Sequence, residues 1–176
     1  MYKPDGFTLI EFIVVILLLS ILSVVILPRF VDLQSNARAS VIESVAGTVK
    51  STNSILRQAL WLDTYPTKIC PNYAPVGRVV ELYLQGSPAG GNCTNATRFD
   101  DQVVWMIWGW MDDIAVDETI RLSGDFDYSN LSWTDSFWGY DLNDDGSVQN
   151  DNCYFHYQQP LIEGDVPTME AIISGC

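Results

Sequence analysis

The most pronounced pattern in the chain is an apolar run near its N-terminus. Over residues 7–27 only Thr8, Glu11, Ser20 and Ser23 are polar. As an α-helix that rises 1.5 Å per residue, this run measures about 31 Å, enough to cross the hydrocarbon core of a bilayer. The pattern therefore predicts a membrane-spanning helix over 7–27.

Beyond this run the apolar positions recur every three or four residues, as on one face of a helix. Pro28 lacks a backbone donor and clashes with the preceding turn, so we expect a bend there. The stripe consists of Phe30, Leu33, Ala37, Val41, Val45, Val49, Leu56 and Leu60. It ends before Tyr65-Pro66, which predicts an amphipathic second half of the helix over 28–62.

After Cys70 the pattern changes to short apolar runs between Gly, Pro, Asn and Asp, which is typical of strands. A short helix fits residues 112–121, and residues 87–92 fit a loop. The strand candidates are 79–84, 103–108, 131–133, 153–157 and 169–173. Because helical crossovers between these candidates are lacking, we expect an antiparallel sheet. The predicted class is α+β, with a globular domain over 63–176.

Charge is distributed unevenly along the chain, which has a formal net charge of −13. Residues 1–62 carry five basic and four acidic side chains, whereas residues 63–176 carry four basic and eighteen acidic ones. Such an acidic domain repels phosphate backbones, so nucleic acid is not an expected partner.

The four cysteines, Cys70, Cys93, Cys153 and Cys176, all follow the apolar run. No C-x-x-C pair accompanies the single histidine, so a zinc site is not indicated. Widely spaced cysteines in an even number indicate two disulfides in an oxidising compartment. Of the three pairings we favour Cys70–Cys93 and Cys153–Cys176, each closing a loop of about 24 residues. One bridge with two reduced cysteines is the alternative.

Glu11 is out of place in an apolar helix, where a carboxylate at the bilayer centre costs about 2.5–3.5 kcal/mol. No basic residue lies within one helical turn of it. A cleaved secretory signal would instead need a small-x-small site close behind the apolar run, and the only candidate, residues 37–39, is too distant and too polar. We therefore expect the helix to stay in the mature protein, with a partner for Glu11 supplied from elsewhere.

Residues 6–11, Gly-Phe-Thr-Leu-Ile-Glu, followed by the apolar run, resemble the processing motif of type IV pilins and pseudopilins. The resemblance implies a leader over 1–6 and a prepilin peptidase that cuts after Gly6 and N-methylates Phe7. It implies that Glu11 neutralises the N-terminal amine of a neighbouring subunit, and Pro28 matches the proline at which family helices bend. Residues 28–34 and 36–38 also resemble the mannose-sensitive haemagglutinin branch of these pilins.

The same resemblance implies a long helix packed on a C-terminal antiparallel β-sheet, and a structural role in a surface filament for adhesion or motility. The precursor would be a single-pass protein of the inner membrane, with its C-terminal domain outside the cytoplasm. The mature chain would then join an extracellular pilus. Its expected partners are copies of itself or related pilins, the peptidase, the assembly machinery and, before assembly, the lipid bilayer.

Residues 141–147 read Asp-Leu-Asn-Asp-Asp-Gly-Ser, which matches the opening of an EF-hand-like calcium loop. The predicted ligands are Asp141, Asn143, Asp145, Ser147 and Asp151. The match is incomplete, because the twelfth position is Asn152 and no flanking helix pair is evident. No cofactor is required by the sequence. A structural calcium ion and a solvated acidic turn are the two interpretations of this loop.

An aromatic-rich region next to many acids fits core filling and subunit contacts better than stacking on a sugar. It comprises Trp105, Trp108, Trp110, Trp133, Trp138 and Tyr140. Catalysis is not expected, because neither a nucleophile elbow nor a Gly-rich phosphate loop is present.

Two alternatives to a filament subunit of the major type stay open. One is a minor pilin or a type II secretion pseudopilin. The other is a single-pass membrane protein that displays a calcium- or glycan-binding domain and does not polymerise.

Overall fold

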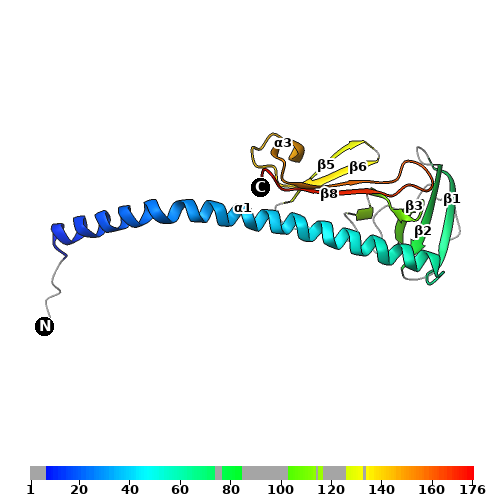
Figure 1. Ribbon diagram of the computed structural model, residues 1–176, viewed down its shortest axis with the longest axis horizontal. Coiled ribbons are helices and arrows are strands. Elements are labelled where there is room, and N and C mark those ends of the chain that lie inside the picture. Colours follow the sequence, from blue (N-terminus) through cyan, green and yellow to red (C-terminus); the bar gives the residue numbers. More distant parts are fainter. Residues whose placement is uncertain (1–6, 74–76, 85–102, 114, 117–125, 133) are drawn as a thin grey trace. The chain divides into compact units, whose positions relative to one another are not determined.

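The dominant element of the structure, a computed structural model, is helix α1 (Leu9–Trp61), which contains 53 residues (Figure 1). The described residues are all except 1–6, 74–76, 85–102, 114, 117–125 and 133. The helix is continuous through Pro28, so the proline does not end it, and the bend expected there stays a prediction. The end at Trp61 confirms the stop predicted before Tyr65-Pro66.

The chain forms two compact units, Met1–Arg38 and Ala39–Cys176. The second unit contains the C-terminal part of α1 together with all of the strands. The four predicted segments 1–6, 7–27, 28–62 and 63–176 stay a prediction.

The strands form two four-stranded antiparallel sheets, where the sequence predicted one. The first has the order β1 (Thr67–Tyr73), β2 (Gly77–Tyr83), β3 (Val103–Ile107) and β4 (Trp110–Met111). The second has the order β5 (Asp127–Ser132), β6 (Asp135–Gly139), β7 (Tyr154–Gln158) and β8 (Thr168–Ile172). A short helix, α3 (Val148–Asp151), lies between β6 and β7. The α+β class and the antiparallel pairing are confirmed.

Four of the five strand candidates coincide with β2, β3, β7 and β8, and the fifth, 131–133, meets only the end of β5. Strands β1, β4 and β6 were not predicted. Of the short helix expected over 112–121, Asp113, Ala115 and Val116 are helical, and the rest lies mostly outside the described residues. The expected loop 87–92 lies outside them entirely.

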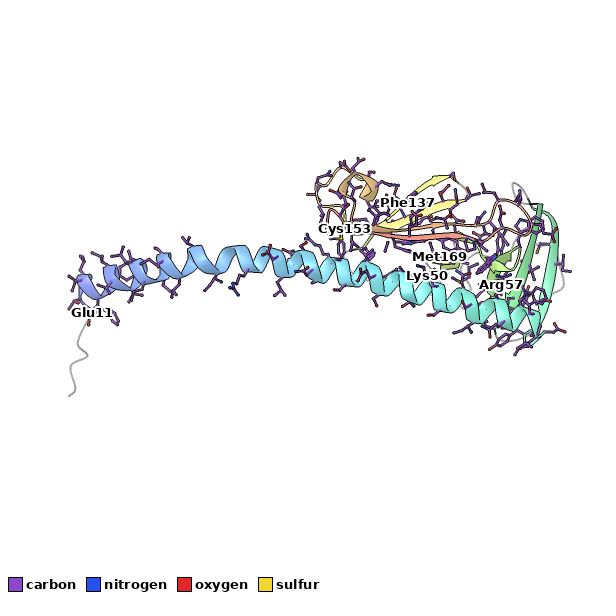
Figure 2. All side chains as sticks on the ribbon, viewed as in Figure 1. Glu11, Lys50, Arg57, Phe137, Cys153 and Met169 are labelled. Carbon is purple, nitrogen blue, oxygen red and sulfur yellow. A yellow bond between two sulfur atoms is a disulfide. The ribbon has the colours of Figure 1, made fainter. Side chains whose placement is uncertain are left out.

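The core of the second unit forms where one face of α1 meets both sheets. The helix contributes Ile42, Val45, Ala46, Val49 and Leu56, all at most 8% exposed. The strands contribute Leu82, Val104, Met106, Met111, Trp138, Phe155 and Tyr157. Cys153 also belongs to this core, and Met169 packs against it (Figure 2). The predicted stripe is confirmed at Val45, Val49 and Leu56, whereas Leu33, Ala37 and Val41 are exposed. Next to Val41, its neighbour Ile42 is buried instead.

Candidate functional site

The start of α1 is built as a capping box, in which an N-cap residue and the third helical residue satisfy each other. Thr8 precedes the first helical residue, Leu9. The backbone N–H of Thr8 donates to Oε2 of Glu11 over 2.8 Å, and the Thr8 hydroxyl donates to the same oxygen over 2.7 Å. In return, the Glu11 N–H donates to the Thr8 hydroxyl oxygen over 3.4 Å. The Glu11 carboxylate therefore has partners within its own chain.

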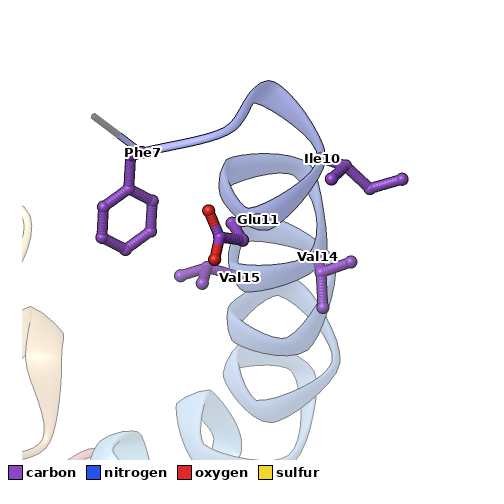
Figure 3. Close-up of a pocket in the computed structure, with 5 residues that line it drawn as sticks. All are labelled: Phe7, Ile10, Glu11, Val14 and Val15. Carbon is purple, nitrogen blue, oxygen red and sulfur yellow. The ribbon is translucent and has the colours of Figure 1, made fainter. Parts of the chain in front are cut away.

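Glu11 also lines a hollow at the helix start. The hollow has a volume of about 340 Å³, and its lining residues are Phe7, Ile10, Glu11, Val14 and Val15. Figure 3 shows the carboxylate on the same side of the helix start as the ring of Phe7. Glu11 is the only charged residue among these five lining residues, so the hollow combines one carboxylate with apolar walls.

The described apolar side chains of the first unit are open to their surroundings. Those described between Phe7 and Ile26 range from 42% exposed at Ile13 to 82% at Phe7. A contiguous apolar surface of this kind normally marks contact with a membrane or another protein. Among the residues that the structure describes, no helix has both the length and the apolar character required to cross a membrane. The predicted span therefore stays a prediction.

The hydroxyls within this apolar segment already have acceptors. Ser20 donates to the carbonyl oxygen of Ile16 and Ser23 to that of Leu19, each over 2.7 Å. Hydroxyls that bond the preceding turn need no water. Ser20 and Ser23 can therefore enter apolar surroundings without losing a hydrogen bond.

The structure places two of the four predicted processing and assembly residues at the helix start. Phe7 lies just outside the helix and Glu11 in its first turn, whereas Gly6 lies outside the described residues. Pro28 lies within α1, well beyond the helix start. The sequence analysis missed the role of Thr8, although the pattern Thr-x-x-Glu before an apolar run is itself a capping-box signal.

The Asp141 loop brings together three of its five predicted ligands. One carboxylate oxygen each of Asp141, Asp145 and Asp151 lie within 4.8 Å of one another. Oδ2 of Asp151 is buried and accepts no hydrogen bond from the described residues. Ca²⁺ binds oxygen at 2.3–2.6 Å, so carboxylates at these separations can share one ion. The donor set fits calcium.

The remaining predicted ligands take part in the loop's own hydrogen bonds. Oδ1 of Asn143 accepts the N–H of Asp145 over 2.9 Å, and the Ser147 hydroxyl donates to Oε1 of Gln149 over 2.8 Å. The two oxygens of Asp141 accept the N–H groups of Asp145 and Gly146 over 3.1 and 2.7 Å. Gly146 has a φ of +81°, the left-handed conformation that the sharp turn of a calcium loop takes at its glycine.

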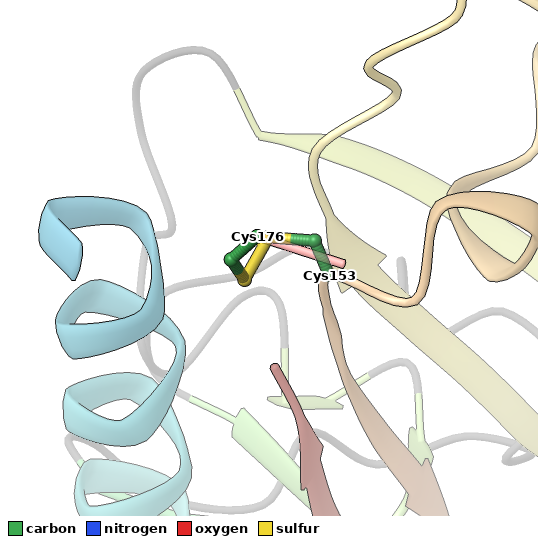
Figure 4. Close-up of a disulfide and its surroundings, with 2 residues drawn as sticks. All are labelled: Cys153 and Cys176. Atoms are coloured by element: carbon green, nitrogen blue, oxygen red, sulfur yellow. A yellow bond between two sulfur atoms is a disulfide. The ribbon is translucent and has the colours of Figure 1, made fainter. Parts of the chain in front are cut away.

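A disulfide joins Cys153, which follows this loop, to Cys176 (Figure 4). It confirms one of the two favoured pairings. Cys70 is disulfide-bonded as well, and its predicted partner, Cys93, lies outside the described residues. Next to the bridge, the N–H of Gly175 donates to the carbonyl oxygen of Asn152 over 3.0 Å, which ties the end of the chain to the end of the loop.

The aromatic residues serve mainly as core and packing groups. Trp105 and Trp138 are 9% and 1% exposed, so neither offers an open ring to a sugar. The guanidinium of Arg57 lies 4.1 Å from the ring centroid of Trp110. Trp133 lies outside the described residues. These contacts favour the core interpretation of the aromatic residues that the structure describes.

Comparison with known proteins identified a matching family and a similar protein. The family described as "Prokaryotic N-terminal methylation motif" matches residues 1–27. A similar protein is the type IV narrow pilus major component PilA5 of Thermus thermophilus, which is 42% identical over 53 residues. This match covers 30% of the chain and 46% of the relative, so the chain spans less than half of that protein's length. No solved structure matches the chain.

Proposed function

Because its first 27 residues carry the N-terminal methylation motif of type IV pilins, we propose that this chain is a structural subunit that polymerises into a type IV pilus. The observation that carries the proposal is the motif over 6–11 at the start of a helix whose described apolar side chains between Phe7 and Ile26 are all exposed. Such a helix requires a cover, first of lipid and then of neighbouring helices.

Processing would convert the helix start into a self-complementary site. Cleavage after Gly6 leaves Phe7 with a new α-amino group, which the same peptidase methylates. That amine is a cation, and Glu11 of a neighbouring copy offers it a carboxylate oxygen in an apolar hollow. Pairing in a low-dielectric environment specifies axial register, because an unpaired charge there is costly.

The membrane stage follows from the apolar sequence over 7–27. In the bilayer this helix is already solvated by lipid, so extraction must replace lipid contacts by contacts with other helices. We therefore expect an energy-coupled assembly machine in the inner membrane, with its ATPase supplied by other proteins. After assembly, the acidic domain would form the outer surface of the filament, where adhesion takes place. The proposed role is structural, without an enzymatic step.

The experiment that tests this function has two parts. The mature protein is analysed by N-terminal sequencing and mass spectrometry, where we expect a methylated Phe7. Glu11→Ala is then compared with the wild type by electron microscopy of sheared filaments. We expect few or no filaments from the variant, and an unchanged number and length of filaments would contradict the assembly role of Glu11.

The same experiments separate the alternatives. A minor pilin or a pseudopilin would be processed identically but would be scarce in sheared filaments. A non-polymerising membrane protein would keep its first six residues. Membership of the mannose-sensitive haemagglutinin branch is part of the proposal and rests on residues 28–34 and 36–38.

As a second function, we propose that the Asp141 loop binds a structural calcium ion. The specific support is that the carboxylates of Asp141, Asp145 and Asp151 converge. In addition, one oxygen of Asp151 is buried and accepts no hydrogen bond from the described residues. Asp141, Asp145 and Asp151 would hold the ion, which would neutralise charge in the loop that leads into Cys153. The solvated acidic turn is the competing interpretation.

A further inference from the structure

We infer that Thr8 is a positioning residue, which holds the Glu11 carboxylate so that one of its oxygens is presented to a second copy of the chain. The inference rests on the proposed function, because it concerns the pairing of Glu11 with the amine of another subunit. It adds a residue to that site and assigns different tasks to the two carboxylate oxygens.

The hydrogen bonds from Thr8 reach only one of the two carboxylate oxygens of Glu11. Both Thr8 donors, the backbone N–H and the hydroxyl, reach the same atom, Oε2, at 2.8 and 2.7 Å. Hydrogen bonds to an ionised acceptor are stronger than those between neutral groups, and here two of them converge. Among the described residues nothing donates to Oε1, which therefore stays available to a donor outside the chain.

The orientation is fixed before a partner arrives. A free glutamate side chain has several rotamers, and pairing it with a neighbour requires that one of them be selected. Thr8 makes that selection within the subunit, because the hydroxyl that donates to the side chain also accepts the N–H of Glu11. Groups that are preorganised in this way lose less entropy when they bind.

The surroundings of Glu11 decide which chemical group fits next to its carboxylate. The other lining residues of the hollow, Phe7, Ile10, Val14 and Val15, have apolar side chains. The group that suits it is a cation borne directly next to an apolar side chain. A second copy that is trimmed to begin at Phe7 carries such a group.

The test uses two variants of Thr8 in the full-length chain, in cells that assemble the filament. Thr8→Val keeps the β-branched shape but removes the hydroxyl, whereas Thr8→Ser keeps the hydroxyl. Filament yield is measured per processed subunit, and a zero-length carbodiimide cross-link between Glu11 and the N-terminus of a neighbour is quantified by mass spectrometry. We expect Thr8→Val to lower both by about tenfold, as for the loss of a charge-assisted hydrogen bond. We expect Thr8→Ser to restore both.

Three results would overturn the inference. The first is that Thr8→Val gives the same filament yield and the same amount of cross-link as the wild type. The second is that Thr8→Ser loses as much of both as Thr8→Val does. The third is that Thr8→Val is defective only in the cleavage step. Glu11→Ala distinguishes this failure from a failure of the proposed function. If Glu11→Ala abolishes filaments while Thr8→Val does not, only the role of Thr8 is wrong, whereas undiminished filaments from Glu11→Ala contradict the proposed assembly itself.

Discussion

Nε2 of His156 lies 2.8 Å from Oδ1 of Asp135, and this contact joins the neighbouring strands β7 and β6. Oδ2 of the same carboxylate accepts hydrogen bonds from Gln158 and Ser132 over 2.9 and 3.2 Å. The imidazole also stacks on the ring of Phe137, with 4.5 Å between the ring centroids. The carboxylate of Asp135 on β6 therefore has hydrogen-bond donors on both β5 and β7. Its ionisation is thus coupled to the pairing of these three strands.

This coupling predicts a stability that depends on pH on the acidic side. Burial raises the pKa of Asp135, but the hydrogen bonds from His156, Gln158 and Ser132 outweigh it and lower the pKa below its ordinary value of 3.8. The native state then binds fewer protons than the unfolded state near that value. The contribution of Asp135 to the free energy of unfolding is therefore present above the unfolded pKa and is lost as the pH falls through the folded one.

We expect Asp135→Asn to lower the free energy of unfolding at pH 7 by about 1–2 kcal/mol, because hydrogen bonds to a charged acceptor weaken. We also expect a shallower decline between about pH 5 and pH 3 than in the wild type. Denaturant unfolding of the full chain in mild detergent, followed by tryptophan fluorescence, measures both. Asp127→Asn is the matched control, since Asp127 is an exposed acid on the neighbouring strand β5. Equal slopes in all three proteins would contradict the assignment.

A second prediction concerns Gly139, the last residue of β6, which pairs with Tyr154 of β7. A Cβ placed on Gly139 would overlap the carbonyl oxygen of Cys153 and the Cα of Tyr154. The obstacle is backbone, which cannot rotate away as a side chain can. We expect Gly139→Ala to lower the free energy of unfolding by about 1–3 kcal/mol, the range for overpacking, in the same denaturant assay.

Gly47 on α1 provides the opposite case for comparison. It is an exposed helical residue, and nothing lies within 4 Å of a Cβ built there. Alanine favours helix over glycine by about 0.8–1 kcal/mol, so Gly47→Ala should stabilise the unit by up to that amount. A stabilising Gly139→Ala would show that β6 and β7 are less closely apposed than the structure indicates.

The helix, the α+β class and four strands followed from the sequence because each depends on a local pattern of apolar positions. Strand β4 did not, since it has two residues and depends on the turn at Trp108 and Gly109. Both have positive φ, 53° and 86°, as the tight turns of hairpins require. Tryptophan rarely adopts that conformation, so composition gave no signal for it. Strand β6 was not predicted because it begins with two polar residues, Asp135 and Ser136, whose hydrogen-bond partners lie far away in the sequence.

The same distinction holds for the candidate sites. Glu11 was identified as an acid within an apolar run, and the loop ligands were identified by their spacing, both of which are local features. The sequence analysis looked for a basic partner of Glu11 and so overlooked Thr8, three residues away. The two oxygens of a carboxylate are equivalent in a sequence, and only coordinates show that one of them is occupied. Likewise, the convergence of Asp151 with Asp141 depends on the turn that follows Gly146.

A third prediction concerns the Cys153–Cys176 bridge, which joins positions 23 residues apart. Replacing both cysteines by alanine releases this loop in the unfolded state. We expect the free energy of unfolding to fall by about 3 kcal/mol under oxidising conditions. Cys153 is fully buried, so a small additional loss from packing is included. An unchanged denaturation midpoint would contradict a stabilising bridge, and the wild type under the same oxidising conditions serves as the reference.

The fourth prediction concerns calcium in the Asp141 loop. An ion that binds only the native state stabilises it by about 2.7 kcal/mol at a hundred times its Kd. For a chain of this size we therefore expect Ca²⁺ to raise the melting temperature by about 5–10 °C, and a chelator to reverse the shift. The measurement is thermal unfolding of the full chain in detergent, with and without EGTA. In Asp141→Asn/Asp145→Asn the calcium-dependent shift should disappear, because two of the three converging carboxylates are lost.

The control for this prediction lies within the same loop. Asp144 is exposed and stands outside the carboxylate cluster, and its φ of 56° is one that asparagine accepts readily. Asp144→Asn removes one negative charge without removing a ligand, so it should keep the full calcium-dependent shift. A shift that shrinks equally in Asp144→Asn and in the double variant would indicate general screening of an acidic surface. A wild type that melts at the same temperature with calcium and with chelator would leave the loop as a solvated turn, because an ion held by three carboxylates cannot bind the native state without stabilising it.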